Sequence, residues 1–191
     1  MRTQLLPDDI KYDGDQLASH WIYQTTGVMG DAITAFIGPC DVKVDAMADL
    51  KDRLAGESIQ SDRMVHFLVE LFGRAMEASV LYQRTLITVI KEVANTLRAA
   101  DANRVSRAGD DLYLETVRGR GKMSVSIATV SPVSAMIHAG INVTEAGAPV
   151  VASGLNDLGI EERTFALAVL VAFAAEIDSL DEARVKTRAV Q

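Results

Sequence analysis

The sequence holds a single cysteine, Cys40, and fewer basic than acidic residues. A lone cysteine cannot form an internal disulfide, which is typical of a reducing compartment, so we expect a cytoplasmic protein. Lys and Arg together number 19 against 26 Asp and Glu, which gives a net charge of -7. Surfaces that bind nucleic acid are normally basic, so this balance argues against nucleic acid as the main partner.

Long apolar runs are also missing from the chain. The longest, FALAVLVAFAA at residues 165–175, is well below the roughly 20 residues needed to cross a bilayer. The first residues, MRTQLLPDDIKYDGD, turn acidic after a very short apolar stretch and contain no signal-peptide core. The three histidines share no metal-ligand spacing, and there is no Walker loop or dinucleotide fingerprint. We therefore predict no metal site and no membrane partner.

The 191 residues, 49% of them hydrophobic, suffice for a sizeable core, and no linker divides them, so a single domain over residues 1–191 is expected. Apolar spacing and capping residues predict helices over residues 14–26, 46–55, 76–99 and 161–180. Strands are predicted over residues 31–38, 62–72, 110–117, 122–130 and 135–143, although the run 62–72 also fits a short helix. This mixture favours an α+β fold, with helices packed on a mostly antiparallel sheet.

Particular residues set these bounds. Asp13 and Asp45 are the expected N-caps of the first two helices, which Gly27 and Gly56 would end. Pro39 is expected to end the pairing of the first strand, because proline has no N–H to donate to a neighbouring strand.

The last three strands are expected to form an antiparallel meander. In the middle strand one face would carry larger side chains and the other face smaller ones: Met123, Val125 and Ile127 against Ser124, Ser126 and Ala128. The final helix is apolar nearly all round, which predicts deep burial or a contact between subunits. A homodimer is expected on this ground.

Three cations and two glycines occupy the five residues of the turn before the middle strand: Arg118, Gly119, Arg120, Gly121 and Lys122. Glycine lets backbone N–H groups approach a ligand closely, and converging cations bind phosphate or carboxylate. Ser124 and Ser126 are expected on the same face as Lys122, where a ligand could lie flat. The alternative is an ordinary charged hairpin turn at the surface.

Other polar residues lie close to this turn in the sequence. Asp110 and Asp111 could hold Mg²⁺ or orient Lys122, although aspartate is also routine in a turn before a strand. In the next strand, Gly140 would allow a backbone or a ligand to approach closely, and Asn142 could hydrogen-bond that ligand.

His66 and His138 stand within apolar strands, so each is a candidate to face a ligand pocket, with a packed structural role as the alternative. Cys40 could act as a nucleophile if one of these histidines lay beside it as a base. The alternative for Cys40 is a small, buried and inert side chain.

Three segments in this order, GDDLYL, GRGKMSVSI and HAGINV, resemble the core of the biotin and lipoate protein ligase superfamily. The whole chain also resembles an archaeal and thermophile family known as domain of unknown function 366. The ligase resemblance implies the fold shared by biotin ligases and class II aminoacyl-tRNA synthetases. It also implies roles for three residues. Lys122 would contact the carboxylate of an acid and its acyl-adenylate, Asp111 would match an Asn-Asp pair, and Asn142 would border the pocket.

The sequence departs from the ligases in places that bear on chemistry. Their glycine-rich basic loop before the long helix is replaced here by an acidic segment, residues 38–62, and Val125 stands where a glycine usually follows the lysine. The predicted function is therefore binding of a carboxylate or acyl small molecule at Lys122, with acyl transfer or ligation as candidate chemistry and a carrier protein as candidate acceptor. The alternative is a non-catalytic ligand-binding or assembly module that has lost adenylation. The residues specify no cofactor.

Overall fold

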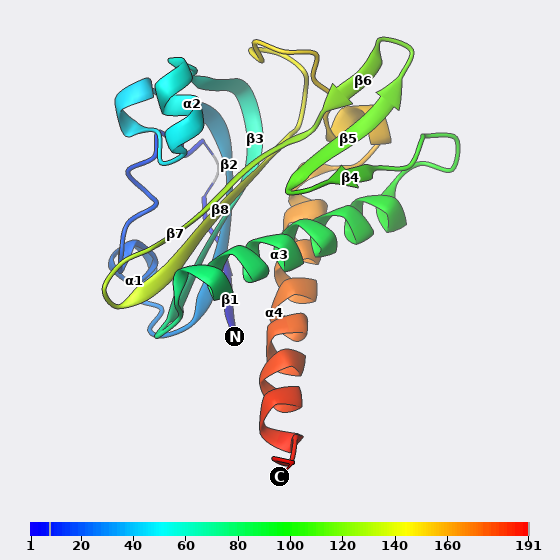
Figure 1. Ribbon diagram of the computed structural model, residues 1–191. Coiled ribbons are helices and arrows are strands. Elements are labelled where there is room, and N and C mark those ends of the chain that lie inside the picture. Colours follow the sequence, from blue (N-terminus) through cyan, green and yellow to red (C-terminus); the bar gives the residue numbers. More distant parts are fainter. Residues whose placement is uncertain (8, 191) are drawn as a thin grey trace.

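The computed structural model describes residues 1–7 and 9–190, and its strands form two sheets (Figure 1). The five-stranded sheet has the order β1 (Arg2–Leu5), β2 (Ala32–Val42), β3 (Ile59–Phe72), β8 (Ser134–Asn142) and β7 (Ser124–Val130). Its strands pair antiparallel except β1, which runs parallel to β2. The three-stranded sheet consists of β4 (Ser106–Ala108), β5 (Asp111–Thr116) and β6 (Gly119–Lys122).

Two long helices, α3 (Met76–Leu97) and α4 (Glu162–Lys186), pack on one face of the five-stranded sheet, which we call the helix face. Both were predicted: α3 has apolar residues at helical spacing, and α4 has a middle that is apolar nearly all round. Leu86 and Ile90 of α3 are fully buried against the sheet, as are Phe165 and Phe173 of α4. The sequence predicted deep burial of α4 or a contact between subunits. Within the chain, one side of α4 is buried, and Leu167 and Val171 on its other side are exposed.

The other face of the sheet, which we call the N-terminal face, is covered by the segment of residues 6–7 and 9–31. This segment contains the short helix α1 (Trp21–Thr26). Tyr12 and Ile22 from the segment pack with Phe36, Met64 and Leu68 of the sheet in a second buried cluster. The short helices η1 (Val44–Ala46) and α2 (Leu50–Ala55) precede β3, and η2 (Leu155–Leu158) precedes α4.

The first predicted helix is wrong in its extent, because α1 begins only at Trp21. Asp13 therefore does not cap it. The residue before it, His20, has a φ of 64°, and its backbone N–H donates to the buried Glu70 carboxylate at 2.9 Å. Residues ahead of α1 lie extended or in turns because they cover the sheet, while Gly27 ends the helix as predicted.

Two other predicted bounds also need correction. β2 continues beyond Pro39 to Val42, because the register shifts between Gly38 and Cys40 and places the proline at an irregularity that needs no N–H there. The second helix is shorter than predicted and is capped by Asp49, whose carboxylate accepts from the N–H groups of Lys51 and Asp52. The strand interpretation of residues 62–72 is confirmed by β3.

The predicted meander of three strands is wrong, because it is divided between the two sheets. β5 pairs with β6 in the small sheet, whereas β7 pairs with β8 in the large one. Met123 lies at the crossing, where its N–H donates to Leu112 and its carbonyl accepts from Asn142. The crossing breaks the alternation of side chains, so Met123 packs into the core of the helix face and Val125 packs on the N-terminal face.

The architecture is α+β, as the sequence predicted. Within residues 1–7 and 9–190, no helix is both long and apolar enough to cross a membrane.

Candidate carboxylate-binding site

Lys122 is the last residue of β6, beside the crossing from the small sheet to the large one. Its Nζ lies 3.0 Å from Asp111 Oδ1 at the start of β5, and the two side chains are 37% and 29% exposed. A lysine ammonium has three N–H donors, and Asp111 occupies one of them. The structure therefore brings Lys122 together with Asp111, the residue that the sequence offered to orient it, and leaves the cation partly open to solvent.

Other side chains extend this pair into a row on the solvent face of the β5–β6 hairpin. Tyr113 lies opposite Lys122 in the strand register and donates its hydroxyl to Asp111 Oδ2 at 3.3 Å. The Arg120 guanidinium lies 4.0 Å from the centroid of the Tyr113 ring, and its Nε is 3.7 Å from Glu115. Positive and negative groups thus alternate along one face of the hairpin.

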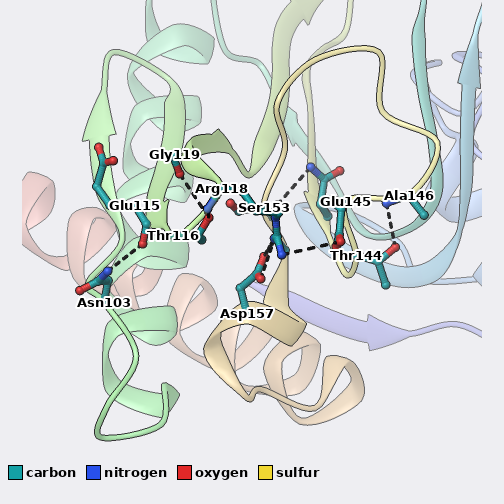
Figure 2. A network of polar contacts seen from close by, with 12 residues as sticks. Asn103, Glu115, Thr116, Arg118, Gly119, Thr144, Glu145, Ala146, Ser153 and Asp157 are labelled. Atoms are coloured by element: carbon teal, nitrogen blue, oxygen red, sulfur yellow. Dashed lines mark hydrogen bonds and ion pairs between the residues drawn. The ribbon is translucent and has the colours of Figure 1, made fainter.

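Arg118, at the tip of this hairpin, belongs to a different network (Figure 2). Its Nη2 donates to both carboxylate oxygens of Asp157, at 2.7 and 2.9 Å, and its Nη1 lies 3.8 Å from Glu145. Asp157 also accepts from the backbone N–H of Gly154 at 3.0 Å. Arg118 therefore joins the hairpin to the segment before α4. Its guanidinium is paired with carboxylates of the protein itself.

The two glycines of the turn serve the chain's own packing. Gly119 has a φ of 105°, which favours glycine at the hairpin bend. A Cβ added at Gly121 would overlap the Ser153 hydroxyl oxygen and would lie 2.7 Å from the Ala152 carbonyl carbon. This close approach arises because Lys122 exchanges backbone hydrogen bonds with residues 151 and 153. The sequence predicted that a ligand could approach the backbone closely at Gly121. In the structure, the backbone of residues 152 and 153 fills that space.

Asn142 fixes the backbone that carries Lys122. Its Nδ2 donates to the carbonyls of Lys122, at 3.2 Å, and Ser153, at 3.3 Å. Its own N–H donates to Met123 at 2.9 Å. Asn142 is 93% buried, so its side chain holds the backbone of Lys122 in place and is not accessible to a ligand at the surface.

Ser124 and Ser126 do not share a face with the site as expected. The Ser124 hydroxyl accepts from the backbone N–H of Leu112 at 2.8 Å. Ser126 accepts from Gln83 of α3 at 2.8 Å and donates to Asp110 at 3.2 Å, so it faces the helix. The broken alternation at Met123 turns both serines towards the protein interior.

His66 and His138 meet, but in the interior. His66 Nδ1 lies 3.0 Å from His138 Nε2, and its own Nε2 lies 3.3 Å from the Gly38 carbonyl. Tyr12 stacks on His138 with the ring centroids 3.6 Å apart, and Phe36 stacks on His66 at 4.9 Å. Burial lowers the pKa of His66 to about 3 and holds that of His138 well below its usual range. Both rings are therefore neutral packing elements under the N-terminal segment.

Cys40 and Gly140 also lie in packed surroundings. Burial raises the pKa of the Cys40 thiol to about 12, and neighbouring Asp41 adds to the rise. A thiol in that state is a poor nucleophile, because the thiolate is the reactive form. A Cβ added at Gly140 would come within 2.9 Å of the Met64 methyl and 3.2 Å of a Val125 methyl, so its missing side chain makes room for neighbours on the N-terminal face.

An open, mostly apolar groove of about 750 Å³ lies beside α2, and its lining contains none of the candidate site residues: Lys43, Val44, Asp45, Leu50, Arg53, Leu54 and Ser58. The described part of the chain also contains no cluster of three or more His, Cys, Asp or Glu side chains that could hold a metal ion. The candidate site is therefore the row of side chains on the β5–β6 hairpin, which contains the exposed cations Lys122 and Arg120.

Residues 1–188 match the family described as a domain of unknown function, DUF366. The chain belongs to the DUF366 family. An uncharacterised protein of Methanocaldococcus jannaschii is 34% identical over 195 residues, which cover 98% of this chain and 84% of that relative. A solved protein of unknown function from Pyrococcus horikoshi is 37% identical, with a TM-score of 0.88 over 99% of this chain and all of its own.

More distant solved structures share the fold of this DUF366 chain. Biotin protein ligase from Aquifex aeolicus has a TM-score of 0.60 at 14% identity, over 95% of this chain and 72% of the ligase. A lipoate-protein ligase A structure bound with ATP has a TM-score of 0.55 at 16% identity, over 93% of this chain and 86% of the ligase. This DUF366 protein therefore has the α+β fold of biotin and lipoate protein ligases, as the sequence predicted.

Sequence analysis of this DUF366 chain missed Tyr113 as part of the site. The signal was present, because a hairpin that turns at residues 117 and 118 places Tyr113 directly opposite Lys122. Expecting one continuous meander concealed that pairing. Glu70 was also missed, since nothing in the sequence near it indicates that it would accept a hydrogen bond from the backbone of His20 in the N-terminal segment.

Proposed function

We propose that this DUF366 protein binds a carboxylate or acyl small molecule at Lys122 and supports acyl transfer or ligation there. The observation that carries this proposal is the exposed Lys122 ammonium, held 3.0 Å from Asp111 at the junction of the two sheets. The fold likeness adds to it, since one ligase-like structure from T. acidophilum carries bound lipoic acid and the A. aeolicus ligase was solved with biotin. Both of those ligands are carboxylic acids.

The residues divide the work by their chemistry. The Lys122 ammonium would bind a carboxylate oxygen and stabilise the negative charge that develops on oxygen in acyl transfer. Asp111 would hold the ammonium in place, and the Tyr113 hydroxyl would hold Asp111. Asn142 would keep the backbone of Lys122 in register.

Calorimetric titration tests this proposal with ATP, biotin, lipoate and octanoate as probes. The wild type is expected to bind at least one of the acids, and Lys122→Ala is expected to weaken that binding roughly tenfold or more, the range for a charged hydrogen bond. Lys186→Ala, at the exposed end of α4, is the matched control and is expected to bind like the wild type. Acid binding that is equal in Lys122→Ala and the wild type would refute the assignment.

The second candidate function is a non-catalytic assembly module, and it is favoured by the filled N-terminal face. Tyr12, His66 and His138 pack there with almost no exposed surface. Such a module would bind none of the four probes, whereas the carboxylate-binding protein would bind an acid through Lys122. The same titration therefore separates the two candidates.

We also propose that the protein acts as a single-domain homodimer in the cytoplasm, with a carrier protein as acceptor. Support for the dimer comes from Leu167 and Val171, which are 49% and 67% exposed one turn apart on α4. Size-exclusion chromatography with light scattering is expected to give twice 20.6 kDa for the wild type and 20.6 kDa for Val171→Glu. Val185→Glu, near the projecting end of α4, is the control and should leave the dimer intact. A monomeric wild type would contradict the dimer.

A further inference from the structure

Two cations of the hairpin point to the same side of β6. Arg120 and Lys122 are two residues apart on this strand, so their side chains leave the same face, roughly 6.6 Å apart at 3.3 Å per residue. Gly121 lies between them, and a Cβ at this position would point to the opposite face, towards Ser153. The two cations therefore face solvent together. Tyr113 of the neighbouring strand β5 lies opposite Lys122, and its ring contacts the Arg120 guanidinium.

A ligand that places its carboxylate at Lys122 can extend along β6 more easily than over the N-terminal face of the sheet. The N-terminal face of the sheet is filled, since a Cβ at Gly38 would overlap the Ile10 carbonyl and Tyr12 lies flat on His138. A long acyl chain lying on that face would have to displace these contacts. Along β6, by contrast, the next side chain on the solvent face is Arg120, which is 52% exposed.

The Arg120 side chain is already held in a position in which it could bind an anionic group. The Tyr113 ring holds the guanidinium at 4.0 Å, which reduces the freedom that it would lose on binding. Its carboxylate partner, Glu115, is 64% exposed and 3.7 Å away. An exposed ion pair of this kind contributes little free energy, so a ligand can replace it.

We infer that the ligand of this site is a short compound with two anionic groups, a carboxylate at Lys122 and a second carboxylate or a phosphate at Arg120. This inference rests on the carboxylate site proposed above, and it narrows the expected ligands from long acyl acids to short dianions. Glu115 would release Arg120 as the dianion binds, while Asp111 keeps its contact with the Lys122 ammonium, which has further N–H donors for the ligand.

Calorimetric titrations with glutarate, phosphoglycolate and octanoate test this inference. Glutarate has two carboxylates, phosphoglycolate has one carboxylate and one phosphate, and octanoate has one carboxylate on a long chain. The wild type is expected to bind glutarate or phosphoglycolate at least tenfold more tightly than octanoate. Arg120→Ala is expected to remove that preference, and Glu115→Gln, which frees Arg120 from its partner, is expected to strengthen dianion binding.

Arg107→Ala, on the neighbouring strand β4, is the matched control, because the Arg107 side chain is exposed and donates to the carbonyl of Gly109. It should bind the dianions like the wild type. Dianion binding that depends on Lys122 but is equal in Arg120→Ala would overturn the dianion inference and leave the carboxylate site standing. If neither glutarate, phosphoglycolate nor octanoate binds in a Lys122-dependent way, both proposals fail.

Discussion

Gly121→Ala is expected to reduce the free energy of unfolding by about 3 kcal/mol, the upper part of the range for overpacking a tight contact. The added methyl group would overlap the Ser153 hydroxyl and press on the backbone at Ala152. Backbone cannot move aside as a flexible side chain can, so the strand that carries Lys122 would separate from residues 151–153. Urea denaturation followed by circular dichroism measures the loss.

Gly119→Ala is the control for that variant, because it changes the same hairpin without the same contact. Nothing lies within 4 Å of a Cβ at Gly119, so its cost comes from the positive φ alone, roughly 1–2 kcal/mol. A loss for Gly121→Ala no larger than that for Gly119→Ala would show that residues 151–153 do not pack against β6 as described.

Acid is expected to destabilise the protein while its carboxylates are still ionised. In the folded state burial keeps the pKa of His66 at about 3 and that of His138 far below its usual range, whereas both titrate near 6.5 when unfolded. Below pH 6.5 the unfolded chain therefore binds protons that the folded chain excludes. The stabilisation is present in full above that pH and is lost as the pH falls towards 3. Each histidine contributes a slope of about 1.4 kcal/mol per pH unit.

Denaturation of the wild type at several pH values between 6.5 and 5 measures this slope, which should approach about 2.7 kcal/mol per pH unit for the pair. His138→Gln keeps a hydrogen-bonding side chain and removes one titrating ring, so its slope should approach half of that value. Stability that stays flat from pH 6.5 to pH 5 would contradict the neutral, buried state of the pair.

Local patterns predicted most of the fold. The helix α3 follows from apolar spacing, and Gly27 and Gly56 end their helices as expected. The apolar run of β3 was expected to be a strand, although a short helix also fitted it. The errors arise where contacts distant in the sequence decide the conformation. Residues ahead of Trp21 cover the sheet instead of forming a helix, and their bond to Glu70 spans 50 positions of the chain.

The part of the candidate site that depends on local structure could be predicted, and the part that depends on distant contacts could not. The Asp111–Lys122 pair follows from a hairpin, which is a local structure, and the two side chains lie within hydrogen-bonding distance. Ser124 and Ser126 were assigned to the wrong face, because the crossing between sheets at Met123 has no signature in the alternating sequence. The meeting of His66 with His138 also depends on the pairing of β3 with β8, which no local pattern specifies.

Calorimetry of the wild type and Lys122→Ala with short and long carboxylic acids tests the central claim most directly. An acid that binds the wild type and loses at least tenfold in affinity when the Lys122 ammonium is removed is the expected result. Binding of every acid with the same affinity in both proteins, or by neither, would contradict a carboxylate site at the junction of the two sheets.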